Sequence, residues 1–163
     1  MQYVLVYSYK DDTNAVSSRR DHVMESWRFV WRNGFAPLLS TPGLDALRKA
    51  LKRDDPRVLQ GETTAPLAVN ANRFRKLEGC CALGYCAWRG EGLDSVGEID
   101  REFGELCAEA DSRLGEPAAS RHFLNWYDDA PRNAMRSGLL TEVERTLRER
   151  FPVAPARAGR TAA

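Results

Sequence analysis

The sequence predicts an α/β fold, with a single sheet and helices packed on it. Apolar stretches rich in β-branched and aromatic residues alternate along the chain with segments whose apolar residues recur at helical spacing. Turn and capping residues separate most of these segments. The predicted order is β-α-β-α-(β)-β-α-β-α. Two architectures fit this order: a mostly parallel three-layer sheet, or a ferredoxin-like two-layer sandwich with an inserted helix.

The densest apolar stretch is residues 78–88, EGCCALGYCAW, which contains three of the four cysteines. It has one charged residue and lies between strongly charged segments, so we expect a buried central strand. The four cysteines do not show the paired spacing of a structural zinc site, and we expect reduced, buried thiols. A metal site or a reactive thiol remains the alternative. These cysteines are Cys80, Cys81, Cys86 and Cys107.

The first half of the chain predicts two strands and two helices. Residues 2–9, QYVLVYSY, predict the first strand. A helix is predicted from Ser18 to a left-handed cap at Asn33-Gly34. A short strand over 35–39 follows, and Thr41-Pro42 begins a second helix that stops at Asp54-Asp55-Pro56.

In the second half of the chain, helix-capping residues and aromatic residues predict the strands and helices. Residues 57–60 and 67–70 are candidate short strands. Ser95 and Glu98 form a capping box that opens a helix closed by Gly115. Residues 121–127 predict a strand, and Asp129 caps a last helix that ends at Phe151-Pro152. We expect one domain over residues 1–152 and a flexible tail over 153–163.

Charge and hydropathy exclude several classes of partner. There are 24 basic and 23 acidic residues, a net charge of +1, so no overall field attracts nucleic acid or an anionic membrane. No apolar run has the length of a membrane span, and no signal peptide is recognisable at the N-terminus. We therefore expect a soluble, cytoplasmic protein.

The helix over residues 19–35 is the leading candidate for a contact surface. Trp27 and Phe29 lie about 200° apart around a helix, so one aromatic side chain should face away from the main core. Exposed aromatic residues next to arginine are typical of interface anchors. The predicted interface residues are Arg28, Phe29, Trp31 and Arg32. The leading hypothesis is a non-enzymatic module for protein association or self-assembly.

The alternative hypothesis is a small metal-dependent enzyme, or a binding domain for a phosphorylated, nucleotide or nucleotide-sugar ligand. Asp11, Asp12 and Asp128 follow predicted strands, and in a parallel sheet they would meet at one edge and bind Mg²⁺. Turn formation and helix capping also explain aspartates at such positions. Phosphate would be bound by Arg19, Arg20, Arg73 and Arg75. The sequence contains no complete catalytic motif.

Overall fold

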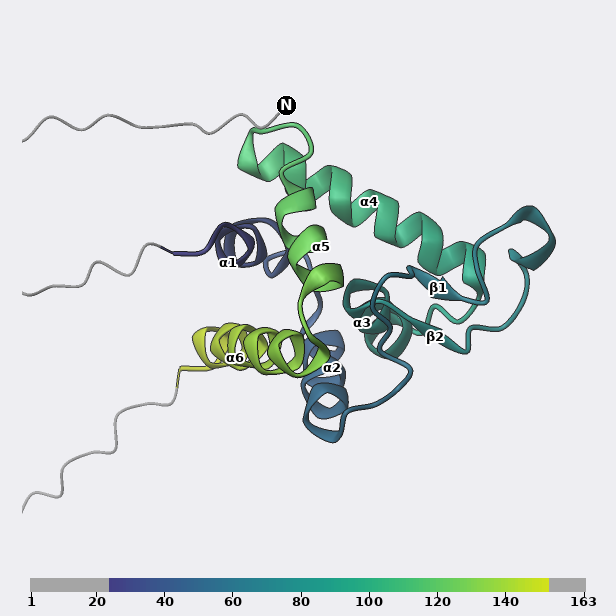
Figure 1. Ribbon diagram of the computed structural model, residues 1–163, viewed down its shortest axis with the longest axis horizontal. Helices are drawn as coiled ribbons and strands as arrows, with labels where there is room; N and C mark the ends of the chain where they lie inside the picture. The colour runs from purple at the N-terminus through teal and green to yellow at the C-terminus, as the bar shows by residue number, and fades with distance from the viewer. Residues whose placement is uncertain (1–23, 153–163) are drawn as a thin grey trace, which may run out of the picture.

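The computed structural model describes residues 24–152, and this part of the chain is mainly helical (Figure 1). Its α-helices are α1 (Ser26–Val30), α2 (Thr41–Arg53), α3 (Ala82–Glu91), α4 (Val96–Leu114), α5 (Ser120–Asp129) and α6 (Arg132–Arg150). A π-helix, η1 (Trp31–Phe35), continues α1, and a short 3-10 helix, η2, covers Asn70–Asn72. No helix in these residues is long and apolar enough to cross a membrane.

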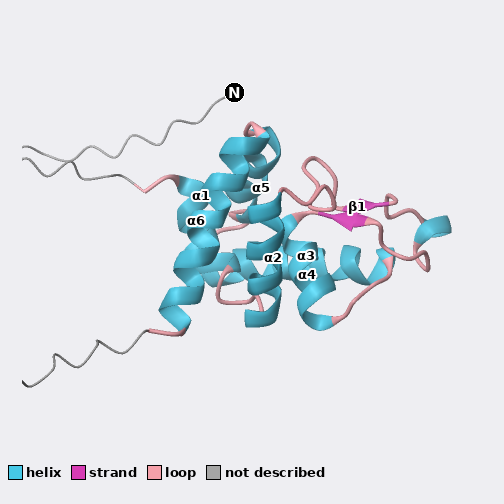
Figure 2. Cartoon of the chain, turned by 90° about the horizontal axis from the view of Figure 1, so that it is seen from below, coloured by secondary structure: helices cyan, strands magenta, loops and turns pink. Residues whose placement is uncertain are grey.

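A small sheet accompanies the helices in this region. Strands β1 (Thr64–Ala65) and β2 (Gly79–Cys80) pair antiparallel, with Thr64 opposite Cys80 and Ala65 opposite Gly79. Figure 2 shows these strands on the side of the helices away from α1 and α6. The strands bring the two ends of residues 66–78 together, which positions the segment between them.

The predicted α/β fold is therefore wrong, and the main error is at residues 78–88. Only Gly79 and Cys80 form a strand, while the apolar residues after them belong to α3. All six residues from Ala82 to Ala87 are buried. A central helix covered on every side has no polar stripe, so a short apolar run does not distinguish it from a buried strand.

Other predicted strands are also helical or irregular. Residues 121–127 lie in α5, where Phe123 and Tyr127, four positions apart, are the buried pair. Residues 35–39 comprise the end of η1 and the turn that follows it. In residues 57–60 only Val58 forms a bridge, with Cys80, and residues 67–70 form no strand. The predicted strand over residues 2–9 lies outside the described residues.

The helices with clear capping signals are confirmed. Ser95 and Glu98 form both hydrogen bonds of a capping box, and α4 ends at Gly115 with φ of +67°. Helix α2 begins at Thr41, as its Pro42 predicts, although the capping side chain is that of Ser40. Helix α6 ends before Phe151-Pro152 as predicted, but its start is not capped by a side chain of Asp129.

The first helix differs from its prediction at its C-terminal end. Its predicted start at Ser18 lies outside the described residues. The helix does not end at Asn33-Gly34. It continues as the π-helix η1 to Phe35. A Cβ atom on Gly34 would lie 3.2 Å from Ala110 Cβ and 3.2 Å from Leu114 Cδ1. The glycine therefore serves close packing of η1 on α4 rather than a helix cap.

Aromatic side chains from distant segments form the centre of the core. Trp31, Phe35 and Phe123 are buried, and the ring centroids of Phe123 lie 5.5 Å from Trp31 and 5.2 Å from Phe35. Trp27 stacks on Trp126 with centroids 3.4 Å apart. These contacts join α1 and η1 to α5.

Helices α2 and α3 approach each other at two glycines. A Cβ atom on Gly43 would lie 2.6 Å from the carbonyl oxygen of Cys86. A Cβ atom on Gly90 would lie 2.5 Å from the Cα atom of Gly43. Since no side chain fits at either position, the two backbones are in direct contact at this crossing.

Candidate functional site

The four predicted interface residues of the first helix do not form one exposed surface. The side chain of Trp31 is fully buried in the core, whereas Phe29 is 50% exposed. The two aromatic residues of the predicted interface are therefore not exposed together. Arg28 and Arg32 are occupied by an ion pair with a residue of α6.

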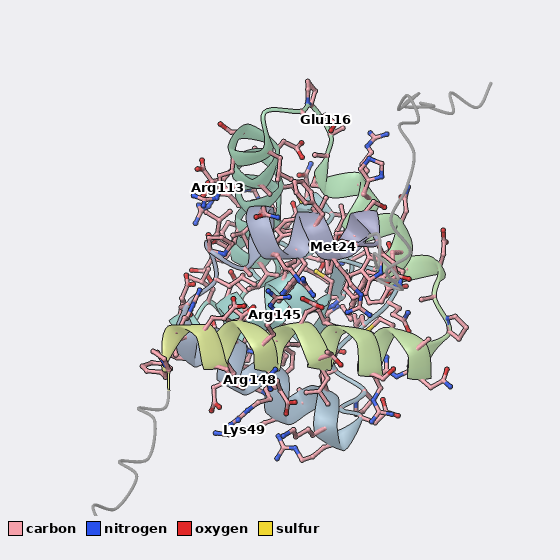
Figure 3. All side chains as sticks on the ribbon, turned by 90° about the vertical axis from the view of Figure 1, so that its left-hand side faces the viewer. Met24, Lys49, Arg113, Glu116, Arg145 and Arg148 are labelled. Atoms are coloured by element: carbon pink, nitrogen blue, oxygen red, sulfur yellow. The ribbon has the colours of Figure 1, made fainter. Side chains whose placement is uncertain are left out.

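This ion pair, the Glu142 centre, consists of Arg28, Arg32 and Glu142. Arg32 donates from Nε to Glu142 Oε2 at 2.6 Å and from Nη2 to Oε1 at 2.8 Å. Arg28 donates from Nη1 to Glu142 Oε1 at 2.6 Å. Figure 3 shows α6 running across the face of the molecule with α1 beside it. The Glu142 centre therefore connects α6 to α1 and η1.

The Glu142 carboxylate is buried, with 1% of its side chain exposed. Burial raises the pKa of Glu142, but the hydrogen bonds from Arg32 and Arg28 outweigh this effect and the pKa is lowered. Glu142 was not among the predicted site residues. The available signal was its spacing, because Glu142 lies three residues after Leu139, on the buried face of α6.

The four thiols are free, and three of them are buried. Burial raises the pKa of Cys81 to about 11 and that of Cys107 to about 12, and it also raises the pKa values of Cys80 and Cys86. These thiols are therefore protonated near neutral pH, which disfavours nucleophilic chemistry at them. No group of three metal-binding side chains occurs within residues 24–152.

Of the residues of the alternative hypothesis, the structure describes only Asp128, Arg73 and Arg75. Asp128 accepts a hydrogen bond from the backbone N–H of Gly61 at 2.8 Å, a structural role. Asp11, Asp12, Arg19 and Arg20 lie outside the described residues. The magnesium site, with the enzyme or nucleotide-binding activity that depends on it, therefore stays a prediction. Arg73 and Arg75 lie together, in a different setting from the predicted one.

That setting is the Phe74 loop, which we define as residues 66–76. Its segment extends beyond the strands at the end of the molecule away from α1 and α6 (Figure 1). Six large hydrophobic side chains are exposed in residues 24–152, and Leu67, Val69 and Phe74 of this loop are three of them. Phe74 is 97% exposed. Apolar side chains gathered on one projecting segment indicate a contact surface.

Backbone hydrogen bonds hold the Phe74 loop in one conformation. The carbonyl oxygens of Arg73 and Arg75 accept from the N–H groups of Gly97 at 2.9 Å and Val96 at 3.0 Å. These are unpaired donors of the first turn of α4, so the loop caps this helix. Within the loop, Asn72 donates its side-chain N–H to the Leu67 carbonyl at 3.1 Å. The exposure of Phe74 thus belongs to an ordered segment.

The Phe74 loop is also positively charged. It contains Arg73, Arg75 and Lys76 and no acidic residue, and all three side chains are exposed. The nearest ion pair, between Arg75 and Glu78, is long at 3.6 Å and lies at the surface. Such a pair contributes little, so the cations stay available to a partner. Two of these cations, Arg73 and Arg75, were predicted as phosphate ligands, whereas the apolar residues Leu67 and Val69 were not among the predicted site residues.

A second exposed apolar site surrounds Phe29, at the opposite end of the molecule. A hollow of about 300 Å³ is lined there by Met24, Phe29, Leu114 and His122, among others. Figure 3 shows Met24 beside α1. Met24 is the first residue that the structure describes, so its exposed fraction is measured against residues 24–152 alone. The Phe74 loop, far along the chain from either end, is the stronger candidate.

Comparison with known proteins supplies no function. No protein-family model matches the chain, and no curated protein or solved structure is significantly similar to it.

Proposed function

We propose that this protein is an association module that binds an acidic protein partner through the Phe74 loop. The observation that carries the proposal is the 97% exposure of Phe74 on a loop held by backbone hydrogen bonds to α4. A large aromatic side chain in contact with water gains hydrophobic free energy when it enters a pocket. Because the loop is already ordered before binding, less conformational entropy is lost when a partner binds.

The composition of the loop specifies the chemistry of the partner. Phe74, with Leu67 and Val69 nearby, fits an apolar pocket, and the surrounding arginines and lysine fit carboxylates at its rim. Charges at a rim mainly accelerate association and select partners, while the buried aromatic residue supplies most of the affinity. The net charge of +1 for the whole chain favours a protein partner over nucleic acid.

The test compares two phenylalanine variants of the full chain. Wild type, Phe74→Ala and Phe29→Ala are used for affinity purification from the native cells, and each enriched protein is then titrated as a pure component by calorimetry. Because Phe74 is expected to be an anchor worth about 2 kcal/mol or more, Phe74→Ala should weaken binding roughly thirtyfold. Phe29→Ala, which also removes an exposed phenylalanine, should bind as wild type does.

Further measurements distinguish this proposal from other modes of binding. Arg73→Glu combined with Arg75→Glu should slow association and weaken the dependence of the rate on salt. Light scattering on the pure protein detects self-association through the same loop. Equal binding by Phe74→Ala and wild type would contradict the proposal, as would binding to DNA, RNA or anionic vesicles with no protein partner. Loss of binding in Phe29→Ala alone would move the site to the first helix.

A further inference from the structure

A groove lies between α2 and α3, on a part of the molecule separate from the Phe74 loop. Its volume is about 600 Å³. Most of its charged lining is basic: Lys49, Arg53, Arg57 and Arg89 line it, with Asp45 as the one acidic residue. Figure 3 shows Lys49 on α2, on the side of this helix away from α1. We refer to this hollow as the α2–α3 groove.

Arg57 is held in place by a buried carboxylate. It donates from Nε to Asp55 Oδ1 at 2.9 Å and from Nη2 to Asp55 Oδ2 at 2.6 Å. The Tyr85 hydroxyl donates to Asp55 Oδ2 at 3.2 Å. The hydrogen bonds from Arg57 lower the pKa of Asp55 well below its usual range, so the carboxylate stays ionised. These bonds leave Nη1 of Arg57 for a ligand, on a side chain that is 46% exposed.

Arg89 is positioned in a different way, by an aromatic ring. Its guanidinium carbon lies 4.0 Å from the centroid of the Trp88 ring, and that of Arg57 lies 5.9 Å from the same centroid. Stacking on an indole restricts a guanidinium without using its N–H groups. The two arginines therefore present ordered hydrogen-bond donors to the same groove.

The charges of the α2–α3 groove are not balanced. Lys49 pairs with Asp45 at 2.7 Å, and Arg57 pairs with Asp55. Among residues 24–152, no carboxylate lies within ion-pair distance of Arg53 or Arg89. Two of the four cations, Arg53 and Arg89, are therefore uncompensated. Near them lies Arg57, whose orientation is fixed by its buried partner Asp55. Such a set favours a ligand with at least two negative charges.

We propose that the α2–α3 groove binds a small molecule carrying a phosphate or diphosphate group. Guanidinium groups match the geometry of phosphate oxygens, and Arg53, Arg57 and Arg89 would supply the donors. The volume of the groove exceeds the needs of a single phosphate, which leaves space for an organic part of the ligand. This site is independent of the Phe74 loop, since the two share no residue.

The experiment titrates the full chain with sodium pyrophosphate and with inorganic phosphate in a calorimeter, at constant ionic strength. Pyrophosphate should bind saturably and more tightly than phosphate because it carries more charge. The double variant Arg53→Gln and Arg89→Gln should weaken pyrophosphate binding by about tenfold or more, since charge-assisted hydrogen bonds are lost. Both side chains are exposed, so the variant should keep the melting temperature of wild type.

The matched control is the double variant Arg101→Gln and Arg145→Gln. It removes the same charge from exposed positions on α4 and α6, and each of these arginines has a surface partner one helical turn away. This variant should bind pyrophosphate as wild type does. Equal losses in the two double variants would show a nonspecific effect of net charge and would overturn the proposal. The absence of saturable heat with wild type, or an equal response to sodium chloride, would also overturn it.

Discussion

The Glu142 centre and the α2–α3 groove both place arginine next to a buried carboxylate, but they use the positive charge differently. At the Glu142 centre, Arg28 and Arg32 bind Glu142, and Arg28 also contacts Glu25 at 2.9 Å. With Glu25 counted, the number of carboxylates there equals the number of guanidinium groups. Four cations line the α2–α3 groove, and only two carboxylates pair with them: Asp45, which lines the groove, and Asp55, which binds Arg57.

This difference shows that guanidinium groups are available to a ligand where the cations outnumber the carboxylates that reach them. Arg28 and Arg32 stand four residues apart on one helical face, the pattern of a basic binding surface. Their partner is 110 residues or more away in the sequence, on α6. Arg53 and Arg89 lie far apart in the sequence, yet in the fold they line the same groove. Availability is thus a tertiary property.

The largest expected effect is at the Glu142 centre. Arg32→Met removes two hydrogen bonds from a carboxylate that is 1% exposed, and this leaves much of a buried charge uncompensated. We expect a loss of about 3–5 kcal/mol in the free energy of unfolding, measured by urea denaturation. Replacing Arg28, Arg32 and Glu142 together by methionine should recover most of this loss, because no buried charge then remains.

Two control variants test whether the loss of stability is specific to the Glu142 centre. Arg145→Met breaks an exposed pair with Glu149 on the same α6 and should cost about 0–1 kcal/mol. Arg89→Met, in the α2–α3 groove, should change the free energy of unfolding by less than about 0.5 kcal/mol. If Arg89→Met were as destabilising as Arg32→Met, both regions would be structural ion pairs and the distinction between them would fail.

An intermediate effect is expected at Asp55, which belongs to the groove but is buried. Asp55→Asn keeps the volume of the side chain and weakens its hydrogen bonds to Arg57. We expect a loss of about 1–3 kcal/mol in the free energy of unfolding, together with weaker pyrophosphate binding because Arg57 is no longer held. Denaturation and calorimetry on the same sample measure the two effects.

The control for Asp55 is the other carboxylate of the groove. Asp45 forms a half-buried pair with Arg48 and a more exposed pair with Lys49 on α2. Asp45→Asn should cost about 0–1 kcal/mol in stability and should strengthen pyrophosphate binding, since it removes a negative charge. Weaker binding in Asp45→Asn than in wild type would contradict the assignment of the groove to an anionic ligand.

The smallest expected effect is the response of stability to acid. Pairing with arginine lowers the pKa of Glu142 in the folded state, as it does for Asp55. Each carboxylate therefore stabilises the fold above the ordinary carboxyl pKa of about 4, and this contribution is lost as the pH falls below that value. Between about pH 5 and pH 3, the free energy of unfolding of Glu142→Gln should fall less steeply than that of wild type. Parallel curves of unfolding free energy against pH for the two proteins would contradict this account.

Local signals predicted helix ends far better than they predicted the fold. The capping box of Ser95 and Glu98 identified the start of α4, because such a box depends on a few neighbouring residues. Residues 82–88 and 121–127 lie in predicted strands, although they form helices. Both segments are apolar or aromatic, and what decides their structure is the set of helices packed around them.

The candidate site was predictable only in part, for a related reason. Arg73 and Arg75 are recognisable as candidate ligand-binding residues because they belong to a short basic segment, residues 70–76, but the exposure of Phe74 was not predicted. The burial of Trp31 and the pairing of Arg32 with Glu142 require knowledge of how α6 and α5 pack on the first helix. Side chains on one helix share a sequence pattern, but their surroundings come from distant parts of the chain.

The glycine crossing of α2 and α3 has a consequence for the size of molecule that the α2–α3 groove accepts. The two helices are the walls of the groove, and the contact of Gly43 with Gly90 fixes how far apart these walls stand. An alanine at position 43 would act as a spacer, since its Cβ atom has no room beside the Cys86 carbonyl. The selectivity of the groove for ligand width is thus encoded in backbone contact, whereas its selectivity for charge is encoded in arginine side chains. Width and charge can therefore be engineered separately.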